Sequence, residues 1–179
     1  MNQHTILTPE QLLQSFQETF TTNVTDPRIE RRTSGTKKTE YVHIWMTLNN
    51  QVFKDAIKHL ISLHPSPHFA VASGYDLGET IELVYHFSLY YGEKGKEISL
   101  NITVPLPKTN PVIETITDLI PGALISEQEK QEMLGVVVKG IPKNTRVFVS
   151  DDFPIGMYPW RRDETGPTPL ARNLHEVKK

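Results

Sequence analysis

Apolar positions in two segments of the chain repeat with the spacing of amphipathic helices. Residues 8–20 begin with Thr8, Pro9 and Gln11, a start that suits a capping box with proline in the first turn. Residues 49–64 begin with Asn49 and Asn50, which can cap a helix, and stop at the sequence HPSP. The spacing therefore predicts two helices with apolar stripes formed by Leu12, Leu13, Phe16 and Phe20, and by Val52, Phe53, Ala56, Ile57, Leu60 and Ile61.

Other segments alternate between apolar and polar residues, which is the period of a β-strand. Residues 24–32 and 41–48 flank the turn sequence TSGTKK, and we expect them to pair as a hairpin. Further strands are predicted over residues 68–76 and 80–91, and over 97–106 after the turn GEKGK. Since these strands have one polar face, we expect a two-layer α+β fold, with a mixed or antiparallel sheet and helices on one face.

The pattern changes after Pro107. The sequence NPVIETITDLIPG, residues 110–122, suggests a short helix, and from residue 143 onward the chain has little periodicity but contains four prolines. Proline removes a backbone donor and interrupts both helices and sheets, so this segment is a poor candidate for an internal core. We therefore divide the chain into an α+β domain, residues 1–122, and a helix-turn followed by an extended C-terminal arm, residues 123–179.

Composition and charge exclude several classes of function. Lys and Arg total 19 against 21 Asp and Glu, and the net charge of −2 gives no long-range field that would attract nucleic acid. There is no cysteine, which excludes disulfides, thiolate catalysis and cysteine-ligated zinc or iron–sulfur clusters in this chain. No window of about 18 apolar residues occurs, so we expect no membrane span and a soluble chain.

The sequence SEQEKQEMLG, residues 126–135, contains the strongest candidates for acid/base chemistry. Ser126 and Glu129 have the spacing of a capping box, Glu127 falls in the first helical turn, and Gly135 fits a C-terminal glycine cap. Glu127 and Glu129 point to roughly opposite sides of a helix, whereas Glu129 and Glu132 share a face. We therefore favour structural roles, and a free-standing hydrolase that uses Glu129 and Glu132 remains an alternative.

The histidines and the Asp151–Asp152 pair are weaker candidates. Three histidines, His59, His64 and His68, lie near the end of the second predicted helix, but their spacing matches no helical pair of metal ligands, so surface positions are favoured. Two adjacent aspartates supply too few ligands for a calcium or magnesium site on their own. We expect no metal-binding, cofactor-binding or catalytic residue in this chain, although a hydrolase based on the histidines is kept as part of the same alternative.

The segment VFVSDDFPIGMYPWRRDETGP, residues 147–167, carries large side chains that are typical of protein interfaces. Phe153, Tyr158 and Trp160, together with Arg161 and Arg162, are of the types enriched at interfaces, in a segment with too little regular pattern to bury them itself. We expect a partner protein to cover them. The alternative is a C-terminus that folds back on its own domain.

A series of residues between 117 and 163 also has a specific spacing. In chain order it comprises Asp118, Pro121, Gly122 and Ala123; Glu127, Gln128 and Glu129; Glu132, Met133, Leu134 and Gly135; Gly140, Ile141 and Pro142; Arg146; Val149 to Phe153; and Arg161, Arg162 and Asp163. This series resembles the 30 kDa, or C-type, subunit of respiratory NADH dehydrogenase and its relatives in membrane-bound, energy-converting nickel–iron hydrogenases. Gln128 stands where the family has arginine and Ile141 where it has histidine, which favours the hydrogenase branch.

The resemblance implies a non-catalytic, cofactor-free subunit of the hydrophilic arm of a ferredoxin-linked hydrogenase complex. Such a subunit would clamp the catalytic large subunit beside the iron–sulfur small subunit, and those partners would hold the nickel–iron site and the clusters. It would be peripheral, on the cytoplasmic side of the membrane, with membrane contact only through the complex. A related NADH or ferredoxin:quinone complex, or a sulfur-reducing complex, is the alternative. The predicted docking residues are Glu127, Glu129, Glu132, Gly135, Gly140, Pro142, Arg146, Asp151, Asp152, Phe153, Tyr158, Trp160, Arg161, Arg162 and Asp163.

Overall fold

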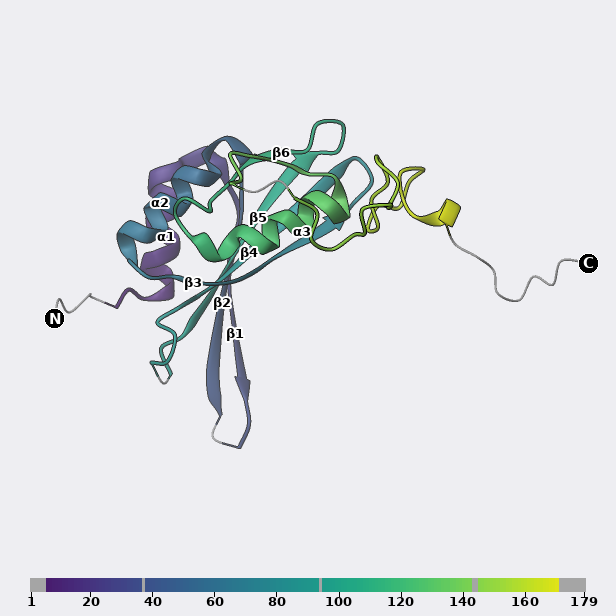
Figure 1. The fold of residues 1–179 in the computed structure, drawn as a ribbon. Coiled ribbons are helices and arrows are strands. Elements are labelled where there is room, and N and C mark those ends of the chain that lie inside the picture. Colours follow the sequence, from purple (N-terminus) through teal and green to yellow (C-terminus); the bar gives the residue numbers. More distant parts are fainter. Residues whose placement is uncertain (1–5, 37, 94, 143–144, 171–179) are drawn as a thin grey trace, which may run out of the picture.

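A five-stranded mixed sheet lies at the centre of the computed structural model, which describes residues 6–36, 38–93, 95–142 and 145–170 (Figure 1). β2 and β5 are parallel, and the other neighbouring strands are antiparallel, so the predicted hairpin and mixed sheet are confirmed. The strands, in the spatial order β1-β2-β5-β4-β3, are β1 (Val24–Ser34), β2 (Thr39–Leu48), β5 (Ile98–Pro107), β4 (Thr80–Leu89) and β3 (His68–Asp76).

Helices α1 (Pro9–Phe20) and α2 (Phe53–Leu63) form at the positions that the apolar spacing predicts. Thr8 and Gln11 form the expected capping box at the start of α1. Asn49 caps a 3₁₀ turn, η2 (Asn50–Val52), that leads directly into α2. A second 3₁₀ turn, η1 (Thr21–Asn23), joins α1 to β1. Both helices bury their apolar stripes in the core.

The helices lie on one face of the sheet, as predicted. Tyr85 of β4 shows this arrangement, since its ring packs against Phe53 of α2 with 4.5 Å between ring centroids, and its hydroxyl donates a hydrogen bond to Glu127. Residues of β4 and β5 that point to the same face as Tyr85, such as Leu83, Phe87, Leu100 and Ile102, are buried. The opposite face carries polar side chains and gives the sheet the wet face expected of a two-layer α+β fold.

Residues 112–139 form a smaller unit that the sequence pattern described only in part. It consists of β6 (Val112–Glu114), a 3₁₀ turn η3 (Pro121–Ala123), helix α3 (Leu124–Leu134) and β7 (Val137–Lys139), with β6 and β7 paired in parallel. The short helix expected over residues 110–122 is wrong. This segment is rich in β-branched residues, and its first part pairs with β7 as a strand instead.

Helix α3 begins earlier than the capping pattern indicated. Its first residue is Leu124, directly after the turn η3, and no side chain caps it. Ser126 lies inside the helix, where its hydroxyl accepts a hydrogen bond from the backbone N–H of Ala72, 3.3 Å away. The predicted Ser126–Glu129 capping box is therefore wrong, whereas the glycine cap is confirmed, because Gly135 ends the helix with a left-handed φ of 68°.

Residues 145–170 run from α3 along one end of the domain and project from it, with a 3₁₀ turn η4 (Thr168–Leu170) as the last described element (Figure 1). This agrees with the predicted extended arm. The division of the chain at residue 122 into a domain and an arm stays a prediction. Within the described residues, no helix combines the length and the apolar character that crossing a bilayer requires.

Candidate functional site

The residues predicted to dock a partner gather around α3 and the segment that follows it. We call residues 145–156 the docking loop and residues 157–166 the clasp. The loop leaves the domain near the C-terminal half of α3, and the clasp returns to the end of the same helix and to β3. Hydrogen bonds between charged side chains and the backbone, and not regular secondary structure, hold both segments in their conformation.

Glu132 and Arg146 fix the shape of the docking loop. The Glu132 carboxylate accepts hydrogen bonds from the backbone N–H groups of Val147, Phe148 and Val149 at 2.7, 2.8 and 2.9 Å. The Arg146 guanidinium donates to the carbonyl oxygens of residues 150, 151 and 153, at 3.1, 3.3 and 2.9 Å. Glu132 thus accepts from backbone N–H groups at the start of the loop, and Arg146 donates to backbone carbonyl oxygens further along it. These hydrogen bonds pre-organise the loop.

The loop turns apolar and acidic side chains toward solvent. Ile155 is 94% exposed, and Val147 and Phe148 are 51% and 44% exposed. Asp151 and Asp152 are exposed between them, and Phe153 is half-buried. A pocket of about 290 Å³ lies between the loop and Glu132, lined in part by Val149, Met157 and Tyr158. An ordered loop that keeps large apolar side chains in water has the properties of an interaction site.

Tyr158 begins the clasp by covering the end of α3. A Cβ atom on Gly135 would lie 2.5 Å from Cζ of the Tyr158 ring, so only glycine fits beneath it. Arg161 stacks over the other part of the ring, 4.7 Å from its centroid, and its Nε donates to the carbonyl oxygen of Leu134 at 2.8 Å. Gly135 therefore both ends α3 and leaves the space in which the Tyr158 ring packs.

Trp160 and Lys130 form a second contact between the clasp and the helix. Lys130 is only 2% exposed, forms an ion pair with Glu129, and lies 4.8 Å from the centroid of the Trp160 ring. The backbone N–H of Trp160 donates to the carbonyl oxygen of Met133 at 3.0 Å. Trp160 stays 42% exposed. Glu129 thus neutralises a buried lysine inside the chain.

Lys108 holds the clasp to the sheet through two carboxylates. Its ammonium lies 2.8 Å from Asp76 and 2.5 Å from Asp163, and the Asp76 side chain is 1% exposed. Lys108, followed by the Thr165 hydroxyl, lowers the pKa of Asp163 well below its usual range. Burial alone would raise the pKa of Asp76, but Lys108 and the backbone N–H groups of Arg162 and Gly78 outweigh it and lower the pKa.

Glu127 lies inside the domain, which corrects its prediction as a docking residue. It is 1% exposed and accepts hydrogen bonds from the Thr115 hydroxyl at 2.5 Å and the Ile116 N–H at 3.0 Å. Burial raises its pKa although these donors and Tyr85 oppose the shift. The buried face of α3 turns this carboxylate toward the sheet, where it holds residues 115–117 in place. Sequence spacing could not distinguish this inward position from a solvent-facing one.

The remaining predicted docking residues lie at the surface. Gly140, Pro142 and Arg162 are exposed, and Gly140 has a left-handed φ of 80°. The structure therefore brings most of the predicted set together around the loop and the clasp, but it uses many of the charged members for internal contacts. The exposed apolar side chains Val147, Phe148 and Ile155 were not in the predicted set, and they lie at the surface of the loop beside the exposed Asp151 and Asp152.

The candidates for acid/base and metal chemistry have internal contacts of their own. Among the described residues, no group of three or more His, Cys, Asp and Glu side chains is arranged to hold a metal ion. His59 hydrogen-bonds Ser15 at 2.9 Å and packs edge-on against Phe16, and burial lowers its pKa. His64 accepts from the backbone N–H of Tyr90, and His68 stacks on Tyr91. These contacts favour the structural roles.

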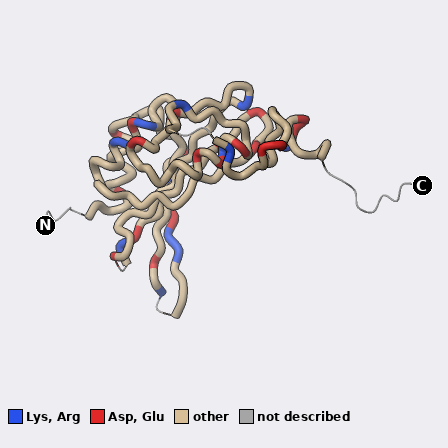
Figure 2. Tube along the Cα trace, viewed as in Figure 1, with Lys and Arg blue, Asp and Glu red and all other residues tan. Residues whose placement is uncertain are grey.

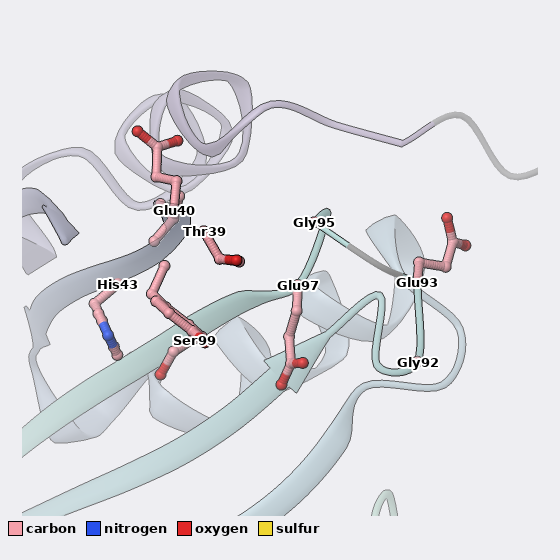
Figure 3. Close-up of a pocket in the computed structure, with 10 residues that line it drawn as sticks. Thr39, Glu40, His43, Gly92, Glu93, Gly95, Glu97 and Ser99 are labelled. Atoms are coloured by element: carbon pink, nitrogen blue, oxygen red, sulfur yellow. The ribbon is translucent and has the colours of Figure 1, made fainter. Parts of the chain in front are cut away.

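A second pocket, of about 270 Å³, lies where β2 and β5 begin (Figure 3). Its lining includes Glu40, Glu93 and Glu97, but the figure shows these carboxylates pointing away from one another. Glu40 pairs with Arg31, Glu93 with Lys96, and Glu97 accepts from Ser88. The pocket therefore gathers acidic residues without directing them at a common ligand.

Comparisons with known proteins place the chain among subunits of respiratory and hydrogenase complexes. The family model described as "Respiratory-chain NADH dehydrogenase, 30 Kd subunit" matches residues 46–169. Membrane-bound hydrogenase subunit beta of Pyrococcus furiosus is 35% identical over 131 residues, which cover 73% of this chain and 75% of that protein. A subunit of the F(420)H(2) dehydrogenase of Methanosarcina mazei is 30% identical over 124 residues, covering 68% and 75%.

A solved structure shares the fold over nearly the whole chain. It is a chain in the structure of the membrane-bound sulfane sulfur reductase, an archaeal respiratory membrane complex, and it superposes with a TM-score of 0.68. The match covers 95% of both chains at 17% sequence identity. At this identity the likeness establishes the fold alone.

Proposed function

The chain belongs to the family of the 30 kDa subunit of respiratory-chain NADH dehydrogenase, and from this membership we propose that it is a non-catalytic subunit of a membrane-bound, ferredoxin-linked hydrogenase complex. In this proposal it lies in the hydrophilic arm, on the cytoplasmic side of the membrane, and touches the membrane only through the complex. The identity to a membrane-bound hydrogenase subunit supports the hydrogenase branch.

The partners in this proposal are the catalytic large subunit and the iron–sulfur small subunit of the same complex. The nickel–iron site and the clusters belong to those partners, and this chain contributes binding surface. Charged residues that a hydrolase would need have structural tasks instead: Glu132 organises the docking loop, and Glu129 neutralises Lys130. These contacts support a structural role over the alternative of a free-standing hydrolase.

The observation that carries the proposal is the exposed apolar surface of the pre-organised docking loop. Glu132 and Arg146 order the loop, and Ile155, Phe148 and Val147 are held in water at its surface. We infer that this loop clamps the large subunit, with Trp160 beside it. Burying one large apolar side chain contributes up to about 1.5–3 kcal/mol, so these side chains would supply part of the free energy of docking, against an association cost of at least about 4 kcal/mol.

A related complex is the second candidate. The fold match to a chain of a sulfane sulfur reductase complex, and the identity to an F(420)H(2) dehydrogenase subunit, support this candidate, because those complexes are named for different substrates. A sulfur-reducing complex, or a quinone-linked complex driven by NADH or ferredoxin, would use the same docking loop. The subunits that co-purify with the chain distinguish these complexes.

The docking role is tested by changing Phe148 and Ile155 to aspartate in the tagged chain, expressed with the rest of its complex. Ile155 is 94% exposed and Phe148 is 44% exposed outside the core, so the variant should fold with little change in thermal stability while the recovery of the large subunit falls by tenfold or more. The control is Ile125→Asp on α3, a residue that is also exposed, at 52%. Equal recovery of the large subunit by the Phe148/Ile155 variant and the control would contradict docking through this loop.

A further inference from the structure

Residues 28–41 of the β1–β2 hairpin, which we call the ribbon, begin opposite the part of β2 that pairs with β5 and continue beyond it as a two-stranded projection. β2 pairs with β5 only from Val42 to Thr47, so the outer pairs, such as Arg32 with Tyr41 and Ser34 with Thr39, have no third strand beside them. Every described residue from 31 to 41 is exposed. Figure 1 shows the ribbon projecting away from the helices and the rest of the sheet. A two-stranded hairpin is marginally stable in water, so a ribbon of this length gains from a partner.

The ribbon carries a charge opposite to that of the rest of the chain. Its five basic residues, Arg28, Arg31, Arg32, Lys37 and Lys38, outnumber Glu30 and Glu40, which gives a net charge of +3. Since the whole chain has a net charge of −2, the remaining residues sum to −5. Figure 2 shows basic and acidic positions along the projecting strands. The molecule thus presents a basic projection from an acidic body.

The arginines retain donors for a partner although they already have contacts within the ribbon. Arg28 donates through Nε to Glu30, and Arg32 through Nη2 to the same carboxylate, both at 3.2 Å. Their side chains remain 55% and 74% exposed. A guanidinium has five N–H donors, so each can still form a bidentate pair with a carboxylate on another protein.

We propose that the ribbon docks onto an acidic surface of another subunit of the complex proposed above; this inference rests on that function. Among the described ribbon residues Tyr41 is the one large apolar side chain that is exposed, at 51%, and a single such side chain with a net charge of +3 gives only weak membrane binding. Exposed arginine is enriched at protein interfaces. The ribbon also lies N-terminal to residues 46–169, which the family model matches, so its partner surface need not be common to the whole family.

The bulge in β1 is consistent with docking through side chains rather than by strand addition. The pairing shifts register between Thr25 and Arg28, where Asp26 has a left-handed φ of 48° and Pro27 lacks a backbone donor. Charged residues and proline on an edge strand discourage the pairing of a further strand. We therefore expect the ribbon to lie against a groove or rim of the partner that carries carboxylates along its length. The partner need not offer an unpaired edge strand.

A carbodiimide, which joins lysine to carboxylate without a spacer, tests the contact in the native complex. We expect mass spectrometry to find Lys38 joined to an aspartate or glutamate of another subunit. The variant Arg32→Glu/Lys38→Glu should weaken association by roughly tenfold or more and dissociate at lower salt, while the charge-conserving variant Lys38→Arg, which keeps Arg32 and its guanidinium, should match the wild type.

The inference is overturned if Lys38 reacts with an acetylating reagent equally fast in the complex and in the isolated chain, and the charge reversal leaves the salt dependence unchanged. It is also overturned if the ribbon binds phosphatidylserine vesicles in a charge-dependent way and gives no cross-link to a protein. Failure of the proposed function looks different, because the wild-type chain would then co-purify with no oxidoreductase subunit at all.

Discussion

Replacing Gly135 by alanine tests whether the clasp is built on the glycine cap of α3. Alanine at φ 68° costs about 1–2 kcal/mol, because L-residues with a side chain strain in the left-handed region. The new Cβ would also lie 2.5 Å from Cζ of Tyr158, so the ring must move and lose its contact with Arg161, which contributes about 0.5–1 kcal/mol. With part of the ring's burial lost as well, we expect the clasp to be destabilised by about 2–4 kcal/mol.

Hydrogen exchange measures this destabilisation at the clasp itself. The backbone N–H groups of Tyr158, Trp160 and Arg162 are bonded to Thr165, Met133 and Asp76, and they should lose protection by about 30- to 1,000-fold in the variant. Gly156→Ala is the matched control, since Gly156 has φ 80° but no atom within 4 Å of its Cβ position. In a Tyr158→Ala background, Gly135→Ala should cost only the backbone strain. Equal losses for Gly135→Ala and Gly156→Ala would refute the account of the clasp.

Two further predictions concern charged groups inside the chain. Lys108→Met leaves the carboxylates of Asp76 and Asp163 without their shared cation. In urea titrations it should lower the free energy of unfolding by about 3–5 kcal/mol. The control Lys58→Met, at an exposed lysine, should lower it by less than about 0.5 kcal/mol. Glu127 has a pKa raised by burial, so its stabilising contribution is complete below its unfolded value of 4.5 and is lost as pH rises through the folded pKa. Glu127→Gln should remove this dependence, so the stability of the wild type relative to the variant should fall as the pH rises above 4.5. A difference that stays constant with pH would contradict a raised pKa.

Much of the fold follows from local sequence patterns. The stripes of α1 and α2, the caps at Thr8 and Asn49, and the alternation in β4 and β5 each determine an element through interactions between residues close in the chain. Residues 110–122 are the exception, because Val112 to Glu114 become a strand only by pairing with Val137 to Lys139. The start of α3 at Leu124 likewise depends on the preceding turn and not on a capping side chain.

The candidate site is less predictable because its residues acquire their roles from distant partners. Periodicity does not reveal that Glu127 faces Tyr85, or that Lys108 binds Asp163, 55 residues further along the chain. The family pattern selected charged residues whose hydrogen bonds are largely internal, and the docking region that it predicts stays a prediction. The apolar surface of the loop depends on how Glu132 and Arg146 fold residues 147–153, which only the three-dimensional structure reveals.

The most direct test of the proposed function is the composition of the native complex. Mass spectrometry of the intact assembly, purified from solubilised membranes through a tag on this chain, should find one copy of the chain for each hydrogenase large subunit and each iron–sulfur small subunit. A large subunit of the quinone-linked or sulfur-reducing type in the same ratio would support the second candidate, a related complex, over the hydrogenase. Recovery of the chain alone, or in a complex without an oxidoreductase subunit, would contradict the proposal.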